Sequence, residues 1–274
     1  MRVYLTVDIE GVAGVVHNLE GSPGNAEYER ARRLMTAEAS AVVAGILDAD
    51  SAAEVLVADV HGPYRNIIPE ELDERALLNR GKPKMWGMVD GVADGFDCAM
   101  MIGVHGKAGS GPSVLSHTFT GVILDVQLNG RSMGELGLNA AMAGHYGVPV
   151  LLVAGDQSVS AEARDLFGDN VVTVEVKESR SHLSAIGVHP KRARAMLREA
   201  AAKAIRDKPE VAPLKLEYPL TAEVTLARPV LADLAEMIDG VERVDGRTVR
   251  FRRDDMPDTY RVLRLITVLC STPL

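Results

Sequence analysis

Short apolar runs that end in acidic or imidazole side chains recur along the first 106 residues. Segments rich in Val, Leu, Ile and Met cover residues 3–11, 54–62 and 98–106, and each ends in such side chains followed by glycine. These runs are typical of buried neighbouring strands of one sheet. Between the first two, apolar residues recur at three- and four-residue steps over 26–47, which predicts a helix. A strand, a helix and a strand in this order favour parallel pairing.

The later chain continues this alternation and then changes character near residue 185. A tight turn is predicted at Asn129-Gly130. The other predicted elements are a helix at 133–146, a strand at 149–156, a short helix near 160–167, a strand at 171–177, an amphipathic helix at 191–206, a short helix near 230–238 and a final helix at 257–269. We therefore predict an α/β fold. Residues 1–185 would form a mostly parallel sheet flanked by helices, and residues 186–274 a smaller α+β region with a candidate role in oligomerisation.

Composition narrows the class of protein. The chain has 274 residues, 47% of them apolar, and a net charge of -8 without a long run of like charge, so nucleic acid is not an expected partner. Cys98 and Cys270 are far apart, which supports neither a disulfide framework nor a cysteine zinc site. No apolar run approaches the roughly 20 residues that a membrane span needs, and no signal peptide is evident. We expect a cytoplasmic protein without a membrane partner.

The polar residues at the strand ends are candidate metal ligands. Residues two apart in a strand face the same side, so Asp8 and Glu10 are expected to project together, as are Asp59 and His61. His105 holds the matching place after the third strand. The carboxyl ends of parallel strands lie at one edge, where such sheets bind their ligands. Unpaired carboxylates there would cost several kcal/mol each if they were desolvated, and a divalent cation satisfies several of them at once.

Glu135 is a further candidate, because it begins a helix otherwise rich in Gly, Ala and Leu. Three carboxylates and two imidazoles suit zinc or manganese and are enough for two ions about 3.5–4 Å apart, with Asp8 as the bridging carboxylate. Simpler interpretations stay open. Glu135 can be an acid favoured by the helix dipole, the Asp8 segment can be a loop start or a helix cap, and Asp59 can serve only to orient His61.

His117 follows a Gly- and Ser-rich segment at 106–113 and could reach over the metals. Its simpler interpretation is a half-buried strand histidine. The glycine-rich segment itself is a weak candidate for a phosphate cradle, because it lacks the Gly-Lys-Ser/Thr ending and a clear helix after it.

Several ordered motifs resemble the M55 family of metallopeptidases, the D-aminopeptidases. They are TVDIEG (6–11), YERARRLMTAEA (28–39), VLVADVHG (55–62), MIGVHGKAG (101–109), LSHTFTG (115–121), NGRSMGELGLNA (129–140) and GVPVLLVAGD (147–156). The last third of the chain is similar only loosely, chiefly at 179–185. Thr6 stands where the family usually has Ser, and it keeps a hydroxyl.

The resemblance implies a pair of zinc ions held by Asp8, Glu10, His61, His105 and Glu135, with Asp8 shared. It also implies that His117 takes the position of the family's proposed catalytic histidine, as a proton shuttle or as a nucleophile. The family forms ring-shaped homo-oligomers, decamers in the characterised form, whose active sites face an inner cavity.

We therefore expect a zinc-dependent aminopeptidase that hydrolyses short peptides with an N-terminal D-amino acid, such as D-Ala-D-Ala. The ions would lower the pKa of a bound water and polarise the scissile carbonyl. One alternative is another dinuclear hydrolase, either an amidohydrolase or a phosphoesterase. A phosphate-selective site would need cations near the metals, for which the motif loops offer chiefly Lys107 and Arg131. The other alternative is a non-catalytic peptide- or metal-binding protein linked to dipeptide uptake.

Overall fold

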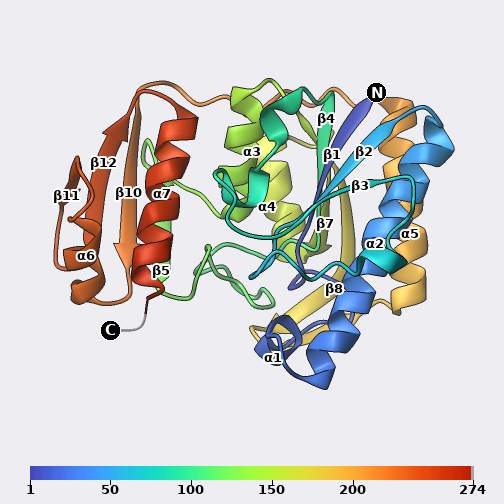
Figure 1. Ribbon diagram of the computed structural model, residues 1–274, viewed down its shortest axis with the longest axis horizontal. Helices are drawn as coiled ribbons and strands as arrows, with labels where there is room; N and C mark the ends of the chain where they lie inside the picture. Colours follow the sequence, from blue (N-terminus) through green and yellow to red (C-terminus); the bar gives the residue numbers. More distant parts are fainter. Residues whose placement is uncertain (273–274) are drawn as a thin grey trace.

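The computed structural model describes residues 1–272, and its larger sheet contains the predicted strand runs (Figure 1). Seven strands lie in the order β3-β2-β1-β4-β7-β8-β9, and every neighbouring pair is parallel except β8 with β9. The strands are β1 (Arg2–Val7), β2 (Glu54–Asp59), β3 (Leu77–Asn79), β4 (Cys98–Ile102), β7 (Val150–Asp156), β8 (Val172–Ser181) and β9 (Ser184–Gly187). The predicted α/β fold with a mostly parallel sheet is confirmed.

Helices cover both faces of this sheet. Figure 1 shows α2 (Ala26–Ala49) and α5 (Pro190–Asp207) on one face and α3 (Glu135–His145) and α4 (Gln157–Phe167) on the other. The helix α2 begins where Asn25 accepts a hydrogen bond from the amide of Tyr28, and its apolar stripe is buried. The shorter helical segments around the sheet are α1 (Asn18–Gly21), η1 (Pro69–Glu71), η2 (Gly87–Val89) and η3 (Val92–Asp94).

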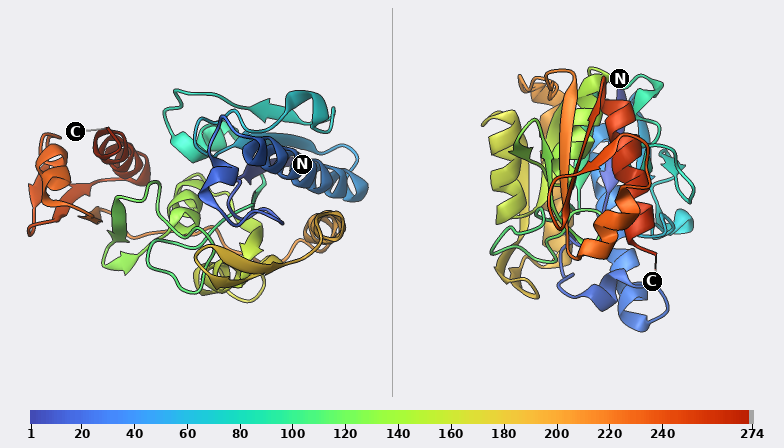
Figure 2. Two further views of the ribbon diagram at one scale, coloured as in Figure 1. Left: turned by 90° about the horizontal axis from the view of Figure 1, so that it is seen from below. Right: turned by 90° about the vertical axis from the view of Figure 1, so that its left-hand side faces the viewer.

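A second, antiparallel sheet stands beside the first along the longest axis of the molecule (Figures 1 and 2). Its strand order is β11-β12-β10-β5-β6, and two helices pack against it. The elements are β5 (Ile123–Leu128), β6 (Arg131–Ser132), β10 (Leu220–Leu226), β11 (Val241–Arg243), β12 (Thr248–Arg253), α6 (Pro229–Ala235) and α7 (Met256–Cys270). The predicted turn at Asn129-Gly130 joins β5 to β6, with both residues at positive φ.

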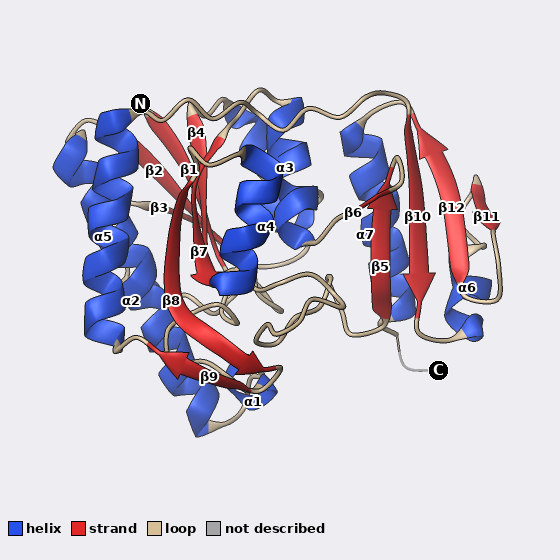
Figure 3. Cartoon of the chain, turned by 180° about the vertical axis from the view of Figure 1, so that it is seen from behind, coloured by secondary structure: helices blue, strands red, loops and turns tan. Residues whose placement is uncertain are grey.

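The division of the chain at about residue 185 stays a prediction, and strand pairing does not follow it. The early strand β5 pairs with the late strand β10, and the late helix α5 packs on α2 (Figure 3). At Gly45 the two helices are so close that an added Cβ would lie 2.2 Å from the backbone oxygen of Arg198. The apolar face of α5 is therefore buried within the chain and is not available for oligomerisation.

The C-terminal helix α7 lies between the second sheet and α3 (Figure 1). Tyr260 of α7 is fully buried, and its hydroxyl donates a 2.7 Å hydrogen bond to the side chain of Asn139 in α3. This contact holds α7 beside the end of the parallel sheet. The last two residues of the apolar ending at 262–274 lie outside the described part of the chain. Among residues 1–272, no helix combines the length and the apolar character that a membrane crossing requires.

Candidate metal centre

Two glycines bring the ends of β1 and β4 into backbone contact beyond the sheet. The amide of Asp8 donates to the carbonyl of Ile102 at 3.0 Å, and the amide of Gly11 donates to the carbonyl of Gly103 at 2.7 Å. An added Cβ would lie 2.0 Å from the oxygen of Asp8 at Gly103, and 2.1 Å from the oxygen of Val104 at Gly11. Only glycine allows these contacts, so the two motif segments converge because of their glycines.

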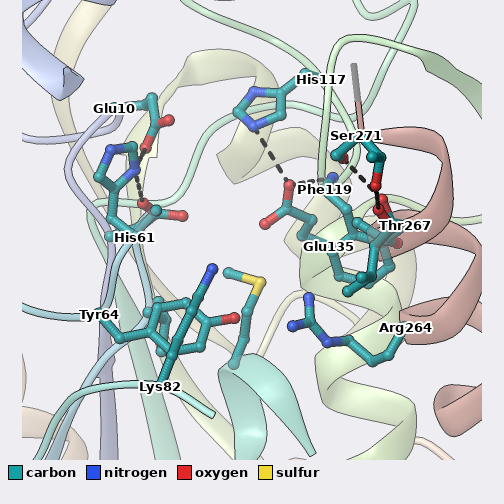
Figure 4. Close-up of a pocket in the computed structure, with 16 residues that line it drawn as sticks. Glu10, His61, Tyr64, Lys82, His117, Phe119, Glu135, Arg264, Thr267 and Ser271 are labelled. Carbon is teal, nitrogen blue, oxygen red and sulfur yellow. Dashed lines mark hydrogen bonds and ion pairs between the residues drawn. The ribbon is translucent and has the colours of Figure 1, made fainter. Parts of the chain in front are cut away.

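Asp8, Glu10 and His61 form the first group of candidate ligands. The Nδ1 atom of His61 lies 3.2 Å from Oδ1 of Asp8 and 2.8 Å from Oε2 of Glu10 (Figure 4 shows the histidine and Glu10). On the other side of the ring, Nε2 lies 2.8 Å from the carbonyl oxygen of Gly21. A proton on Nε2 satisfies this carbonyl, which leaves Nδ1 as the free ligand atom that faces the two carboxylates.

Asp8, His105 and Glu135 form the second group. The Nε2 atom of His105 lies 3.8 Å from Oδ2 of Asp8 and 3.4 Å from Oε1 of Glu135, and its Nδ1 lies 3.0 Å from the carbonyl of Gly106. Glu135 begins α3, and its Oε1 accepts a 2.6 Å hydrogen bond from the amide of Phe119. Asp8 is thus common to both groups and presents one oxygen to each histidine.

His117 lies at the open side of the centre. Its ring stacks on that of His105 with centroids 4.0 Å apart, and its Nε2 lies 3.6 Å from Oε1 of Glu135 (Figure 4). Its Nδ1 lies 2.8 Å from the carbonyl oxygen of Leu115. The side chain is 26% exposed, against 1% for His105. His117 also lies close enough to Glu10 and His105 for a third possible ligand group.

The charges of the cluster depend strongly on one another. Burial and the neighbouring Glu10 raise the pKa of Asp8 to about 8. Burial opposes ionisation of Glu10 too, but His61 outweighs it and holds the pKa of Glu10 well below its usual value. Burial alone would lower the pKa of His105, whereas Glu135 raises it to about 10. Glu10 and Glu135 thus depend on the imidazolium groups of His61 and His105 for their charge, whereas Asp8 is mostly protonated near pH 7 without a bound cation.

This donor set fits zinc. Three carboxylates and two imidazoles are ligand types that Zn²⁺ binds, and they lie in two groups that share one carboxylate. The Oε2 atom of Glu10 is buried, and within residues 1–272 it makes no hydrogen bond, although it lies near Nδ1 of His61. A cation would satisfy this oxygen.

A buried lysine holds the segment that carries Glu10, and sequence reasoning missed it. The Nζ atom of Lys177 donates to the carbonyl oxygens of Glu10, Val12 and Val15 at 2.5, 2.9 and 2.6 Å. Strand alternation would place Lys177 on the exposed side of β8. A register shift pairs it with Asp156 and turns it inward, and no local pattern signals that shift.

Two further buried acids support the loops around the centre. Glu38 of α2 accepts from the amide of Ala13 at 3.0 Å. Asp156 caps α4 with one carboxylate oxygen and holds Ser113 and Val114 with the other, both at 2.9 Å. The loop that leads to His117 is therefore tied to the end of β7. Sequence reasoning could have found Glu38, because it is a charged residue on the face of α2 that the apolar pattern predicts to be buried.

Asp59 does not contact His61, contrary to the interpretation in which it orients that ring. Its carboxylate accepts three hydrogen bonds, at 2.5 and 2.7 Å from the backbone and side chain of Asn66 and at 2.8 Å from the amide of Ile67. The side chain of Asn66 also donates to the carbonyl oxygen of His61 at 2.6 Å. Asp59 thus supports the backbone of His61 through Asn66, and the acceptor for the ring is the carbonyl of Gly21.

Two cavities open on this centre. One has a volume of about 490 Å³ and is lined by four of the candidate ligands (Asp8, Glu10, His61 and Glu135), by His117 and by residues of α7 (Figure 4). The other, of about 480 Å³, lies beside Asn18 and His182 and shares Glu10, His61 and His117 with the first. Both fall within the size range of small-molecule sites, roughly 300–1,000 Å³.

Comparison with known proteins agrees with this geometry. A family model described as D-aminopeptidase, Peptidase_M55, matches residues 1–265. A D-aminopeptidase of Bacillus subtilis (strain 168) is 36% identical over 270 residues, which are 98% of this chain and 97% of that protein. The solved structure of the Zn-dependent D-aminopeptidase DppA from Bacillus subtilis, described as a self-compartmentalizing protease, has a TM-score of 0.96 and 35% identity and covers 100% of both chains. The chain belongs to the M55 family of peptidases, the D-aminopeptidases.

Proposed function

We propose that the protein is a zinc-dependent aminopeptidase that removes an N-terminal D-amino acid from short peptides of the D-Ala-D-Ala type. Membership of the M55 family makes the chain a peptidase. The observation that carries the specific proposal is the pair of ligand groups that share Asp8 at the strand ends. The zinc dependence of the similar Bacillus subtilis enzyme supports the choice of metal.

Each ligand group would hold one ion. Asp8, Glu10 and His61 would hold the first, and Asp8, His105 and Glu135 the second. When bound, the ions would polarise the scissile carbonyl and lower the pKa of water in the site. The carbonyl of Gly21 fixes His61, and the carbonyl of Gly106 fixes His105, with the ligand nitrogen turned inward.

We assign proton transfer to Nε2 of His117, with direct attack through the same atom as the alternative. Burial and the neighbouring His105 lower the pKa of His117, so the ring is neutral near pH 7 and can accept a proton. The carbonyl of Leu115 takes the proton on Nδ1 and leaves Nε2 free. Glu135 lies 3.6 Å away, where it can stabilise the imidazolium that forms.

A self-compartmentalizing relative supports a homo-oligomer, and we propose a decamer with an inner cavity that admits short peptides. On the C-terminal helix, Leu265 and Val268 are 46% and 58% exposed and are candidates for the contact surface. A cytoplasmic location stays a prediction.

The phosphoesterase alternative loses the two cations that the motif loops offered for it. Lys107 donates to the hydroxyl of Ser132 at 2.9 Å, and Arg131 pairs with Asp165 at 2.9 Å. Neither lines the two cavities at the centre. Both basic residues of the motif loops are therefore engaged elsewhere.

A substrate panel tests the proposed function. The zinc-loaded protein would be assayed on D-Ala-D-Ala, L-Ala-L-Ala and p-nitrophenyl phosphate, before and after removal of zinc by a chelator. We expect hydrolysis of D-Ala-D-Ala alone, lost with zinc and restored when zinc is returned. Equal cleavage of the L-dipeptide would contradict D-selectivity, and hydrolysis of the phosphate ester would favour a phosphoesterase. Binding of the dipeptide without turnover would indicate a binding protein.

A further inference from the structure

Two cations that are not part of the metal centre face its larger cavity. Arg264 comes from α7 and Lys82 from the loop after β3. Figure 4 shows the guanidinium and the ammonium pointing into the same space, on the side of Glu135 away from His117. Burial and the nearby Arg264 lower the pKa of Lys82, so the two positive charges repel each other. Within residues 1–272, neither forms an ion pair, and neither donates a hydrogen bond.

The surroundings of Arg264 give its side chain a defined place. Its stem rests against Gly87 in η2, where an added Cβ would lie 2.7 Å from Nε of the arginine. The hydroxyl of Tyr64, a buried residue that lines the cavity, points toward the same space and accepts no hydrogen bond from the described residues (Figure 4). A half-buried guanidinium held in place without an acceptor is an incomplete site for an anion.

We propose that Arg264, assisted by Lys82, binds the free α-carboxylate at the C-terminus of the peptide substrate. This inference rests on the proposed function and adds a selection by chain length, because only a short peptide can place its free carboxylate in this cavity while its first peptide bond lies at the metal centre. The N-terminal residue then lies toward the second cavity, beside Glu10 and His117.

The chemistry of the pair favours a carboxylate. A guanidinium presents two parallel donors that match the two oxygens of a planar carboxylate. Lys82 is exposed, and its ammonium lies 4.6 Å from the centroid of the Tyr64 ring, so it adds a positive charge without the paired donors of a guanidinium. Arg264 lies on the α7 side of the cavity and Lys82 lies across from it, and both are on the side of Glu135 away from His117 (Figure 4). That part of the cavity therefore suits the carboxylate end of a substrate.

The test compares substrates that differ only in this charge. The zinc-loaded wild type and the Arg264→Gln variant would be assayed on D-Ala-D-Ala and on its C-terminal amide. We expect the wild type to prefer the free acid by about 10-fold or more in kcat/KM, mainly through KM. The variant should lose this preference, because its kcat/KM falls more on the acid than on the amide. Arg264→Lys should restore part of the preference, and Lys82→Gln should weaken it less than Arg264→Gln does.

Arg261→Gln is the matched control, because Arg261 lies on the same helix but stacks over Trp86 outside the cavity. It should behave as the wild type. An equal loss on acid and amide in Arg264→Gln, or no preference in the wild type, would overturn the carboxylate site.

If the zinc-loaded wild type cleaved neither compound, the proposed function would be wrong, but the carboxylate site could still be tested. The binding of the same two compounds would then be measured by calorimetry in place of kcat/KM. In that experiment, tighter binding of the acid than of the amide, lost in Arg264→Gln, would support the carboxylate site. Equal binding of both compounds by the wild type would overturn it.

Discussion

His117 differs from His61 and His105 in exposure and in charge, because burial lowers its pKa whereas nearby carboxylates raise theirs. We expect His117→Ala to keep its zinc and to lose about 10²–10⁴-fold in kcat, the usual contribution of a proton-transfer group. Metal analysis of a sample measures its zinc content, and D-Ala-D-Ala kinetics on the same sample measure its turnover. The control is His145→Ala, an exposed histidine on α3. Near-normal turnover would make His117 structural, and loss of zinc would make it a ligand.

Asp8 presents its two oxygens to different histidines, at 3.2 Å from His61 and 3.8 Å from His105. We therefore expect Asp8→Ala to lose both zinc ions, whereas Glu135→Gln, in one group only, loses one. Asp165→Ala, at an exposed position, should keep both. Zinc content after dialysis measures this, and two equivalents retained by Asp8→Ala would exclude a bridging role.

Residue types at strand ends predicted that Asp8, Glu10, His61 and His105 would lie together, and the structure brings these four side chains to one edge. They could not show what holds those side chains, because the acceptors for the rings of His61 and His105 are backbone carbonyls. Sequence reasoning did not identify Arg264 and Lys82 as site residues either. Their sequence positions are 182 residues apart (264 minus 82), and only the packing of α7 against α3 brings them to one cavity.

At the level of the elements, the backbone contact just beyond the ends of β1 and β4 depends on Gly103. This residue has φ +67, and a Cβ there would meet the backbone of Asp8. Gly109 has φ +79 and nothing within 4 Å of an added Cβ. Gly109→Ala should cost about 1–2 kcal/mol of unfolding free energy, from backbone conformation alone. Gly103→Ala should cost clearly more and also weaken zinc binding.

Urea unfolding and zinc titration of the two glycine variants measure this difference. Similar losses of stability in both would mean that the strand ends can separate without harm to the centre.

The helix α2 carries a buried acid whose charge opposes folding. Burial raises the pKa of Glu38 from 4.5 to about 7, so the folded state binds its proton more tightly than the unfolded state does. Its contribution to stability is fully present below about pH 4.5 and is lost as the pH rises through 7. Relative to Glu38→Gln, the wild type should therefore lose about 2 kcal/mol of unfolding free energy between pH 5 and pH 8.

Urea unfolding at both pH values checks this, with the exposed Glu199→Gln as a control that should track the wild type. A constant difference between wild type and Glu38→Gln would show that Glu38 is ionised throughout.

Helices with a clear apolar stripe were predicted to within a few residues, since their period is local. Two features of the sheets were not predictable in this way. The register shift that turns Lys177 inward breaks the alternation on which strand faces are assigned. The pairing of β5 with β10 joins segments about a hundred residues apart, and the local sequence of neither strand indicates which strand it pairs with.

For the whole molecule, the strongest expectation is assembly. Light scattering should give a mass several times that of the 29.4 kDa chain, and ten times for the proposed decamer. Assembly that encloses the active sites should also leave folded proteins intact while D-Ala-D-Ala is cleaved. A stable monomer at micromolar concentration would contradict the oligomer, and rapid cleavage of a folded protein would contradict the enclosure.

The C-terminal helix has a practical consequence for anyone who handles this protein. Ser271 and Thr272, the last residues that the structure describes, line the larger cavity at the metal centre (Figure 4). An affinity tag fused after Leu274 would be separated from Thr272 by only two residues in the sequence, so we expect it to compete with short ligands for the cavity. Met1 lies at the opposite end of the molecule, where its ammonium pairs with Asp50 at 3.2 Å (Figure 1). A tag placed there costs one partly exposed ion pair and leaves the cavity mouth clear.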